Sequence, residues 1–215
     1  MCGRFSLALE PTEIEEHFGA RFTEPMQRRY NAAPSQRLPV ILNADPRSIV
    51  LAPWGIKPPW LVKRDGLINV RAETLREKRT FRENLVDRRC LVPADGFYEW
   101  QARPNGKKTP YRIVRRAGGL FAFAGIWEAE RHAGATGPRF AIITTRANDL
   151  MRPIHIRMPV ILATDQERIW LSANTPVSEL LAMLEPAPST DLRAYEVSSK
   201  VNRASIDTPS VMQPA

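Results

Sequence analysis

The stretch Arg89-Cys90-Leu91-Val92-Pro93-Ala94-Asp95-Gly96-Phe97-Tyr98-Glu99-Trp100-Gln101 contains two candidate strands, Arg89 to Val92 and Phe97 to Gln101, near the middle of the chain. Runs of β-branched and aromatic residues predict further strands on both sides of it. These runs are Leu38 to Leu42, Ser48 to Ala52, Tyr111 to Val114, Leu120 to Trp127, Phe140 to Thr145, Pro159 to Ala163 and Leu192 to Val197. Strands therefore dominate the central part of the sequence.

Short helices are predicted by capping signals that flank these strands. Capping boxes of the form Thr-x-x-Glu begin at Thr12, Thr80 and Thr164, and Thr175-Pro176 opens a fourth helix. The elements do not alternate regularly, as they do in a parallel βαβ sheet. We therefore predict an α+β fold, a single domain with a mixed, barrel-like twisted β-sheet core flanked by short helices.

The length of 215 residues suits one generous domain, and no linker divides the chain. We expect this domain to span residues 1–207 and to be followed by a flexible C-terminal tail over 208–215. No stretch approaches the roughly 18 apolar residues that a membrane span needs. The N-terminus lacks the basic segment and apolar run of a secretory signal. A cytoplasmic protein without membrane contact is expected.

The charge balance points to an anionic partner. Lys and Arg number 31 against 23 Asp and Glu, which gives a net charge of +8, and 25 of the 31 cations are Arg. The planar guanidinium suits phosphate and stacks on bases, so the excess favours nucleic-acid binding. The alternative is that an Arg-rich genome uses Arg wherever a surface cation is needed.

Metal and disulfide chemistry are not indicated by the cysteines and histidines. Cys2 and Cys90 cannot make a disulfide framework, and Cys90 lies in an apolar run. The three histidines (His17, His132 and His155) have no metal-binding spacing. We expect neither a metal site nor a cofactor.

Cys2 follows the initiator methionine and becomes the first residue if Met1 is removed. It would then carry an α-amine with a pKa of about 7.7–8.0 beside a thiol with a pKa of about 8.5. Such an aminothiol condenses with an aldehyde to an imine, after which the sulfur closes a thiazolidine ring. The alternative is that Cys2 is an incidental residue at a loose end.

Three other segments place polar residues beside apolar ones. Asn69 and Arg71 end an apolar run before a helical stretch, and Glu99 shares a strand face with Phe97. An apolar environment would raise the pKa of Glu99 and suit it to acid–base work. His155 and Arg157 would share a face if their segment is extended, which suits an anionic substrate. Two of these residues also have a purely structural interpretation. Glu99 would then point outward from a half-buried sheet, and His155 would be a hydrogen-bonded core residue.

Six motifs occur in order over nearly the whole chain. They are Met1-Cys2-Gly3-Arg4-Phe5, Tyr30-Asn31-Ala32-Ala33-Pro34, Trp54-Gly55, Ile68-Asn69-Val70-Arg71-Ala72-Glu73-Thr74, Pro93-Ala94-Asp95-Gly96-Phe97-Tyr98-Glu99-Trp100 and His155-Ile156-Arg157-Met158-Pro159. Together they resemble the SRAP family, the SOS response-associated peptidases or abasic-site processing proteins. The length is similar to that of bacterial members that consist of the SRAP domain alone.

The resemblance implies a covalent reaction with damaged DNA. Members shield abasic sites in single-stranded DNA by forming a thiazolidine between the N-terminal cysteine and the opened sugar, as part of the DNA damage response. By motif, Cys2 would be the nucleophile, Asn69 would position the sugar and amine, and Glu99 and His155 would be the acid–base pair. The resemblance further implies residues that line a DNA channel: Arg4, Pro34, Arg71, Trp100, Thr144 and Arg157.

Apolar residues near the Trp-Gly segment would wedge the DNA, and here the candidates are Pro58, Pro59 and Trp60. The resemblance implies a monomer that needs no cofactor, binds single-stranded DNA with abasic sites and associates with the nucleoid on damage. It also implies autopeptidase activity and weak lyase activity, because an imine can undergo β-elimination. The sequence departs from the family pattern at Ile156, an apolar residue where a polar one would be tolerated. This difference leaves the catalytic assignment intact.

Three other functions fit parts of the sequence. An N-terminal-nucleophile amidohydrolase also begins Cys-Gly after methionine removal, and there the thiol attacks an amide. A net charge of +8 is not needed for such a substrate. The others are a module that coats single-stranded DNA with Cys2 passive, and a peptidase limited to residues ahead of its own cysteine.

Overall fold

The computed structural model describes residues 2–57, 66–77, 79–129 and 137–215. Within them the chain forms many short strands and few helices. The strands are β1 (Phe5–Leu7), β2 (Arg21–Phe22), β3 (Arg29–Ala32), β4 (Arg37–Leu42), β5 (Asp45–Pro53), β6 (Asn69–Arg71), β7 (Arg89–Ala94), β8 (Gly96–Ala102), β9 (Lys108–Arg115), β10 (Phe121–Ala129), β11 (Pro138–Arg146), β12 (Arg157–Pro159) and β13 (Leu192–Glu196). The helices are α1 (Pro11–Phe18), α2 (Ala72–Glu77), α3 (Arg79–Asp87), α4 (Thr164–Leu171) and α5 (Val177–Ala182), with 3-10 turns η1 (Ser189–Asp191), η2 (Ser199–Asn202) and η3 (Pro209–Met212).

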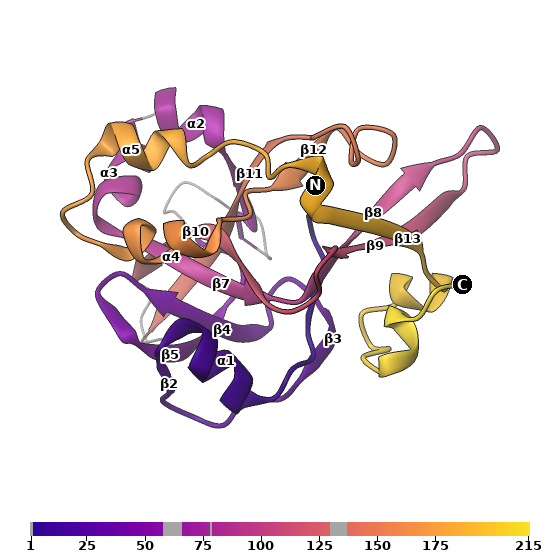
Figure 1. The fold of residues 1–215 in the computed structure, drawn as a ribbon, viewed down its shortest axis with the longest axis horizontal. Helices are drawn as coiled ribbons and strands as arrows, with labels where there is room; N and C mark the ends of the chain where they lie inside the picture. Colours follow the sequence, from indigo (N-terminus) through magenta and orange to yellow (C-terminus); the bar gives the residue numbers. More distant parts are fainter. Residues whose placement is uncertain (1, 58–65, 78, 130–136) are drawn as a thin grey trace.

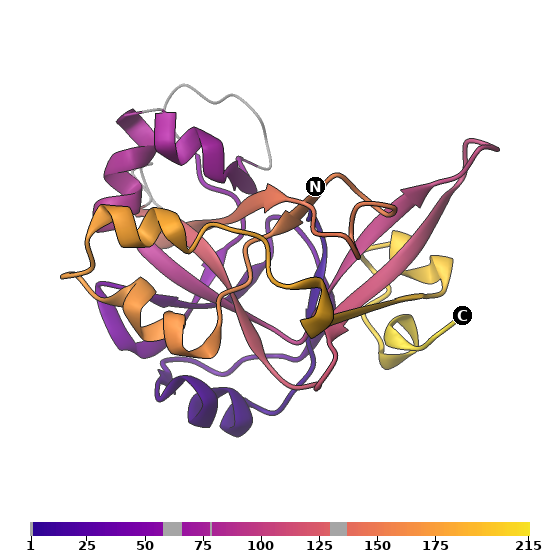
Figure 2. The same ribbon diagram turned by 45° about the horizontal axis from the view of Figure 1, so that its top comes forward.

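The strands form two sheets. The smaller sheet has the order β13-β9-β8-β1-β3, and the larger has the order β12-β11-β10-β7-β4-β5-β2, with β6 paired to β11 in parallel. Figures 1 and 2 show α2, α3, α4 and α5 gathered at one end of the molecule, while the β8–β9 hairpin projects from the other. The predicted α+β class is confirmed. Among the described residues the larger sheet ends at β12 and β2, so the core is two open sheets and not a closed barrel.

An aromatic core holds the two sheets together. Phe5 of β1 packs edge-on against Trp54 and Phe123, with ring centroids 5.2 and 5.8 Å apart. Phe97 of β8 also meets the ring of Phe123 edge-on, with the centroids 6.0 Å apart. Such pairs add about 0.5–1.5 kcal/mol each beyond the burial of their area. A second apolar cluster, which includes Leu75 of α2, Leu85 of α3 and Trp170 of α4, lies between the larger sheet and the helices.

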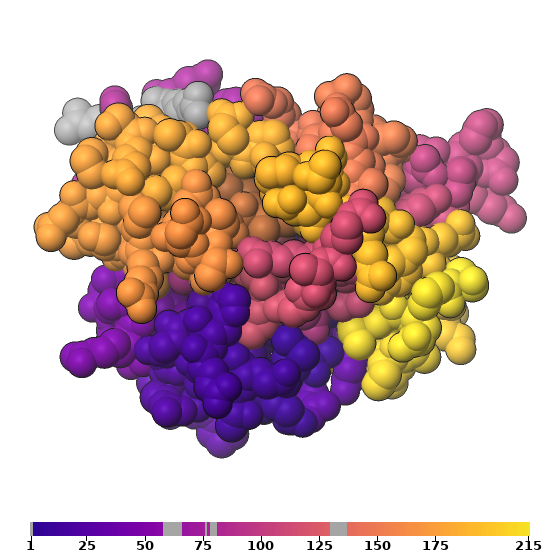
Figure 3. Space-filling model, viewed as in Figure 1, coloured from indigo at the N-terminus to yellow at the C-terminus, as the bar shows by residue number. Residues whose placement is uncertain are grey.

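The C-terminal residues fold back on the smaller sheet (Figure 3). Val211 of η3 is fully buried beside Tyr98, and the Ala215 N–H donates to the carbonyl of Glu196 at 3.0 Å. Residues 208–215, predicted to be a flexible tail, include η3 and cover an apolar patch of the smaller sheet. The division into a domain over 1–207 and a tail stays a prediction.

Arg89 is a buried cation that connects β7 to two helices. Its side chain is 1% exposed and donates hydrogen bonds to the carbonyls of Leu85 and Val86 at the end of α3. It also donates to the carbonyls of Trp170 and Ser172 at the end of α4, each at 2.7 Å. A cation at two helix C-termini complements both dipoles. Arg89 thus joins the helical end to the sheet.

We expect Arg89→Ala to lower the free energy of unfolding by about 3 kcal/mol or more, because several buried carbonyls lose their donors. Urea denaturation would measure the change. Arg82→Ala removes an exposed Arg from the same helix region and should stay within about 0.5 kcal/mol of wild type. Equal stability of the two variants would contradict this role for Arg89.

Candidate active site

The N-terminal segment lies inside the protein. β1 pairs with β3 on one side and with β8 on the other, and Cys2, just before it, has no exposed surface. The Asp95 carboxylate holds this segment by accepting hydrogen bonds from the Ser6 hydroxyl at 2.5 Å and the Ala8 N–H at 2.8 Å. Arg112 pairs with the same carboxylate at 3.0 Å. The position of residue 2 is therefore fixed by both neighbouring strands.

Asn69 makes a direct contact with Cys2. It begins β6, is 8% exposed, and its Nδ2 donates to the Cys2 carbonyl at 2.8 Å. Its Oδ1 is buried and has no hydrogen-bond partner among the described residues. A buried amide oxygen without a partner is costly, so this atom is available to accept a hydrogen bond from a bound group.

Glu99 interacts electrostatically with Cys2 and with His155. Glu99, on β8, is 3% exposed, and burial raises its pKa while the interaction with His155 opposes the rise. His155 lies between the turn over residues 151–154 and β12, outside the strand. Its Nδ1 lies 3.0 Å from the Arg157 N–H, from which it accepts in the neutral Nε2–H tautomer, and 3.1 Å from the Arg157 carbonyl.

A cavity of about 430 Å³ opens at this place, lined by Glu99, Trp100, Lys108, His155 and Asn202. The Cys2 thiol lies 3.9 Å from the carbonyl of Arg4, and burial, followed by the negative charge of Glu99, raises its pKa. The thiol is therefore protonated at neutral pH. The structure thus brings together the four residues predicted to be catalytic: Cys2, Asn69, Glu99 and His155.

Two of the predicted DNA contacts, Arg71 and Arg157, lie near a carboxylate. Arg157 forms a bidentate ion pair with Glu73, at 2.6 and 2.9 Å, and also donates to the Thr144 carbonyl at 2.7 Å. This pairing, together with the charge of Arg71, lowers the pKa of Glu73. Thr144 is fully buried, whereas Arg71 is exposed at the end of β6.

The remaining predicted contacts differ in their surroundings. Arg4 is half-buried and donates to the Asn31 side chain and the Val201 carbonyl, each at 2.8 Å, with its guanidinium 5.9 Å from the Trp100 ring centroid. Trp100 donates through Nε1 to Asn202 at 2.7 Å. Pro34 is half-buried in a turn, and Ile156 is 76% exposed. The wedge candidates Pro58, Pro59 and Trp60 lie outside the described residues.

Sequence reasoning missed three residues of this region as participants. Glu73 belongs to a quoted motif, but nothing in the sequence pairs it with Arg157 84 positions away. Asn202 and Lys108, which line the cavity, carry no sequence signal at all, since they reach it only through the fold. Among the described residues no group of three or more His, Cys, Asp or Glu could hold a metal ion. None of the described helices is long and apolar enough to cross a membrane.

The chain is similar to known proteins in sequence and in structure. Residues 1–204 match the family described as SOS response associated peptidase (SRAP). The chain is 40% identical over 223 residues to the abasic site processing protein YoqW of Bacillus subtilis (strain 168), with 99% of each covered. It is 42% identical over 211 residues to YoaM, an abasic site processing protein of the same strain, covering 94% of this chain and 93% of YoaM. A crystal structure of a Bacteroides thetaiotaomicron protein covers 100% of both chains at 26% identity, with a TM-score of 0.88.

We expect Glu99→Gln to stabilise the fold increasingly as pH rises. A carboxyl whose pKa is raised by folding contributes stability that is present below its unfolded pKa and is lost as pH rises through the folded pKa. Glutamine stays neutral throughout, so the Tm of the variant minus that of wild type should increase from about pH 4 to about pH 8. Glu16→Gln, at an exposed helix position, is the control and should show no such trend. A pH-independent difference for Glu99→Gln would contradict the raised pKa.

Proposed function

The chain belongs to the SRAP family, and we propose that it processes abasic sites in single-stranded DNA by forming a covalent thiazolidine through Cys2 after Met1 is removed. The observation that carries this proposal is the placement of Cys2, whose carbonyl is held by Asn69 at 2.8 Å and whose thiol is influenced by Glu99, which in turn interacts with His155. An abasic sugar in its open form is an aldehyde, which is the group that an aminothiol traps.

The order of bond formation follows from the state of the thiol. Because burial keeps the Cys2 thiol protonated, the α-amine attacks first and adds to the aldehyde carbon to give a carbinolamine. Loss of the hydroxyl as water leaves an imine. The sulfur then adds to the imine carbon while its proton passes to the nitrogen, so the net reaction releases one water. The product is a five-membered thiazolidine.

Glu99 and His155 supply the proton transfers in this proposal. A closed abasic sugar must receive a proton at its ring oxygen to open, and the carbinolamine needs an acid to lose water. Glu99 is suited to donate a proton because burial raises its pKa above that of an exposed carboxyl. His155 can exchange a proton with it, since the two line one cavity. Asn69 Oδ1, buried and free to accept, would orient the amine or a sugar hydroxyl.

Binding of single-stranded DNA is supported by charge and by an aromatic platform. The net charge is +8, and Arg71 is exposed near the buried Asn69. The Trp100 ring is fixed by Asn202 and lines the cavity, so a base next to the lesion could stack on it. Arg157 shares its charge with Glu73, so we expect it to contribute less to phosphate binding than Arg71. We further propose a cytoplasmic monomer that associates with the nucleoid on damage.

Peptidase and lyase activities are secondary candidates. A thiol nucleophile needs a lowered pKa, whereas the pKa of Cys2 is raised by burial, so general peptidase or amidohydrolase activity is disfavoured. Release of its own Met1 remains compatible with the site, since it would expose the reactive amine. Slow strand cleavage would follow from β-elimination at the imine stage before the sulfur closes the ring.

We expect purified protein to crosslink abasic single-stranded DNA to a product that survives a denaturing gel. Cys2→Ala should give no such band, and Cys2→Ser should give only a hydrolysable adduct because it keeps the amine but cannot form the sulfur ring. Protein that retains Met1 should bind the DNA without crosslinking. Cys90→Ala is the control and should crosslink, because Cys90 lies within β7 and has no free α-amine to form an imine. A wild-type protein that binds without any stable band would favour a non-covalent DNA-binding module.

We expect Glu99→Gln and His155→Ala to slow crosslink formation or reversal by about 10²- to 10⁴-fold each, because general acid–base groups contribute about that much. The two effects should not add, because both residues serve one proton path. Single-turnover rates at saturating abasic DNA over about pH 5–8 would measure this, with DNA affinity measured separately. Wild-type rates for both variants would show that these residues are structural.

A further inference from the structure

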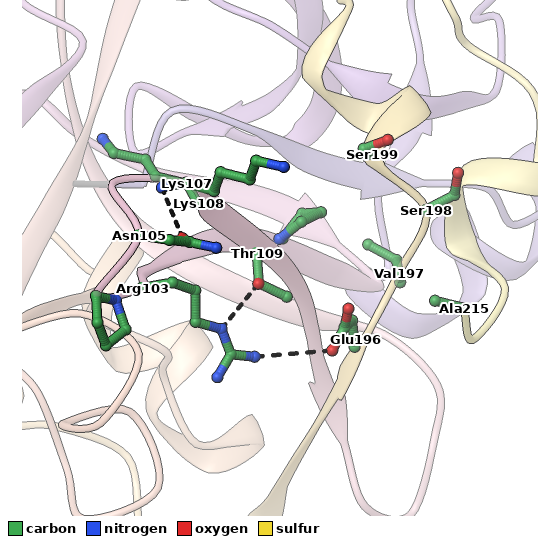
Figure 4. Close-up of a pocket in the computed structure, with 12 residues that line it drawn as sticks. Arg103, Asn105, Lys107, Lys108, Thr109, Glu196, Val197, Ser198, Ser199 and Ala215 are labelled. Carbon is green, nitrogen blue, oxygen red and sulfur yellow. Dashed lines mark hydrogen bonds and ion pairs between the residues drawn. The ribbon is translucent and has the colours of Figure 1, made fainter.

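A second cavity, of about 650 Å³, lies beside the turn that joins β8 to β9 (Figure 4). Its walls come from the hairpin on one side and from the segment after β13, with Ser198 and Ser199, on the other. Lys108 lines this cavity and also the active-site cavity that holds Glu99 and His155. The two cavities are therefore neighbours that share one lysine.

The register of the hairpin explains how Lys108 reaches both cavities. Trp100 lies opposite Pro110, and Ala102 lies opposite Lys108. Since side chains of directly opposed residues point to one face and alternate along a strand, Lys108 and Trp100 share a face. Trp100 is fixed there by Asn202 at 2.7 Å. Lys108 thus extends from the edge of the base-stacking platform toward the second cavity.

The cations of this hairpin are of two kinds. The guanidinium of Arg103 has partners within the protein. It donates to the hydroxyls of Thr109 at 2.9 Å and Tyr111 at 3.2 Å, and it lies 3.8 Å from the Glu196 carboxylate. Lys107 and Lys108 are exposed, and neither ammonium forms an ion pair with a described carboxylate. Ser198 and Ser199 line the same cavity. Free ammonium groups opposite hydroxyls are the donors that bind phosphate oxygens.

We propose that this cavity is a groove for the DNA strand on one side of the abasic site, and that Lys108 binds the phosphate at the passage from the active-site cavity into the groove. The proposal rests on the proposed function, because the abasic sugar must occupy the first cavity. Lys108 is then a positioning residue that holds the backbone next to the lesion. Lys107, Ser198 and Ser199 contact the phosphates farther along.

The test measures binding with oligonucleotides that cannot crosslink. Each carries a tetrahydrofuran abasic analogue, which has no aldehyde, with either no nucleotide, and so no phosphate, or about eight nucleotides on one side of it. Four forms of the protein are compared by fluorescence anisotropy over a salt series: wild type, Lys108→Gln, Lys108→Arg and Arg168→Gln. Arg168→Gln removes an exposed cation from α4, which lies far from the hairpin (Figure 1), and is the charge-matched control.

We expect Lys108→Gln to lower the slope of log Kd against log salt by about 0.7, one phosphate contact on a single strand. Its affinity deficit should shrink by about threefold between about 50 and about 200 mM salt. The loss should occur only with the longer arm on one side of the analogue, which also identifies that side. Lys108→Arg should restore the slope, and Arg168→Gln should match wild type.

Several outcomes would overturn the groove. An unchanged slope for Lys108→Gln with both arms on either side would remove Lys108 from the DNA path. If Lys108→Gln and Arg168→Gln lose the same affinity, Lys108 contributes only to the general positive charge of the surface. The proposed function is judged separately, by whether wild type crosslinks a short-armed oligonucleotide with a true abasic site. Crosslinking can fail while the arm-dependent binding persists, which would contradict the proposed function alone. Crosslinking can also succeed while the arm-dependent binding is absent, which would contradict the groove alone.

Discussion

The insertion of β1 between β3 and β8 is the constraint on which the rest of the molecule depends. Only three residues long, this strand pairs on both edges, and Cys2, three residues ahead of it, is fully buried. The C-terminal segment locks it in place, because Asn31 donates through Nδ2 to the carbonyls of Val201, Arg203 and Ile206 and accepts from Arg4. The C-terminal segment that holds β1 also contributes Asn202 to the candidate active-site cavity, and the backbone of Cys2 is held by Asn69.

The longer strands could be predicted from the sequence because their apolar runs are continuous. β7, β8 and β10 agree with the predicted runs to within two residues at each end. The shorter strands, β1, β2, β3 and β6, could not be predicted, because two to four residues carry no usable period and their pairing depends on distant partners. The predicted strand at Pro159 to Ala163 is displaced to Arg157–Pro159, and only Ile161 beyond it makes an isolated bridge, with Phe123.

The candidate site was predictable to the extent that its residues stand in local motifs. Cys2, Asn69, Glu99 and His155 were chosen from four separate segments, and the fold brings them to one place. What could not be predicted is the pairing between motifs. Arg157 was expected to face DNA, yet Glu73 holds it in a bidentate pair, and Arg4 serves partly to join the N-terminus to η2. These contacts depend on three-dimensional distance, which the motif spacing does not contain.

The burial of the Cys2 thiol also affects its oxidation by peroxides. Peroxides react with thiolates and not with thiols, and they need access to the sulfur. Cys2 has no exposed surface, and burial raises its pKa, so both requirements fail. The Cys2 sulfur is therefore protected from sulfenic acid formation in this conformation. The packing that positions the residue also keeps its thiol reduced.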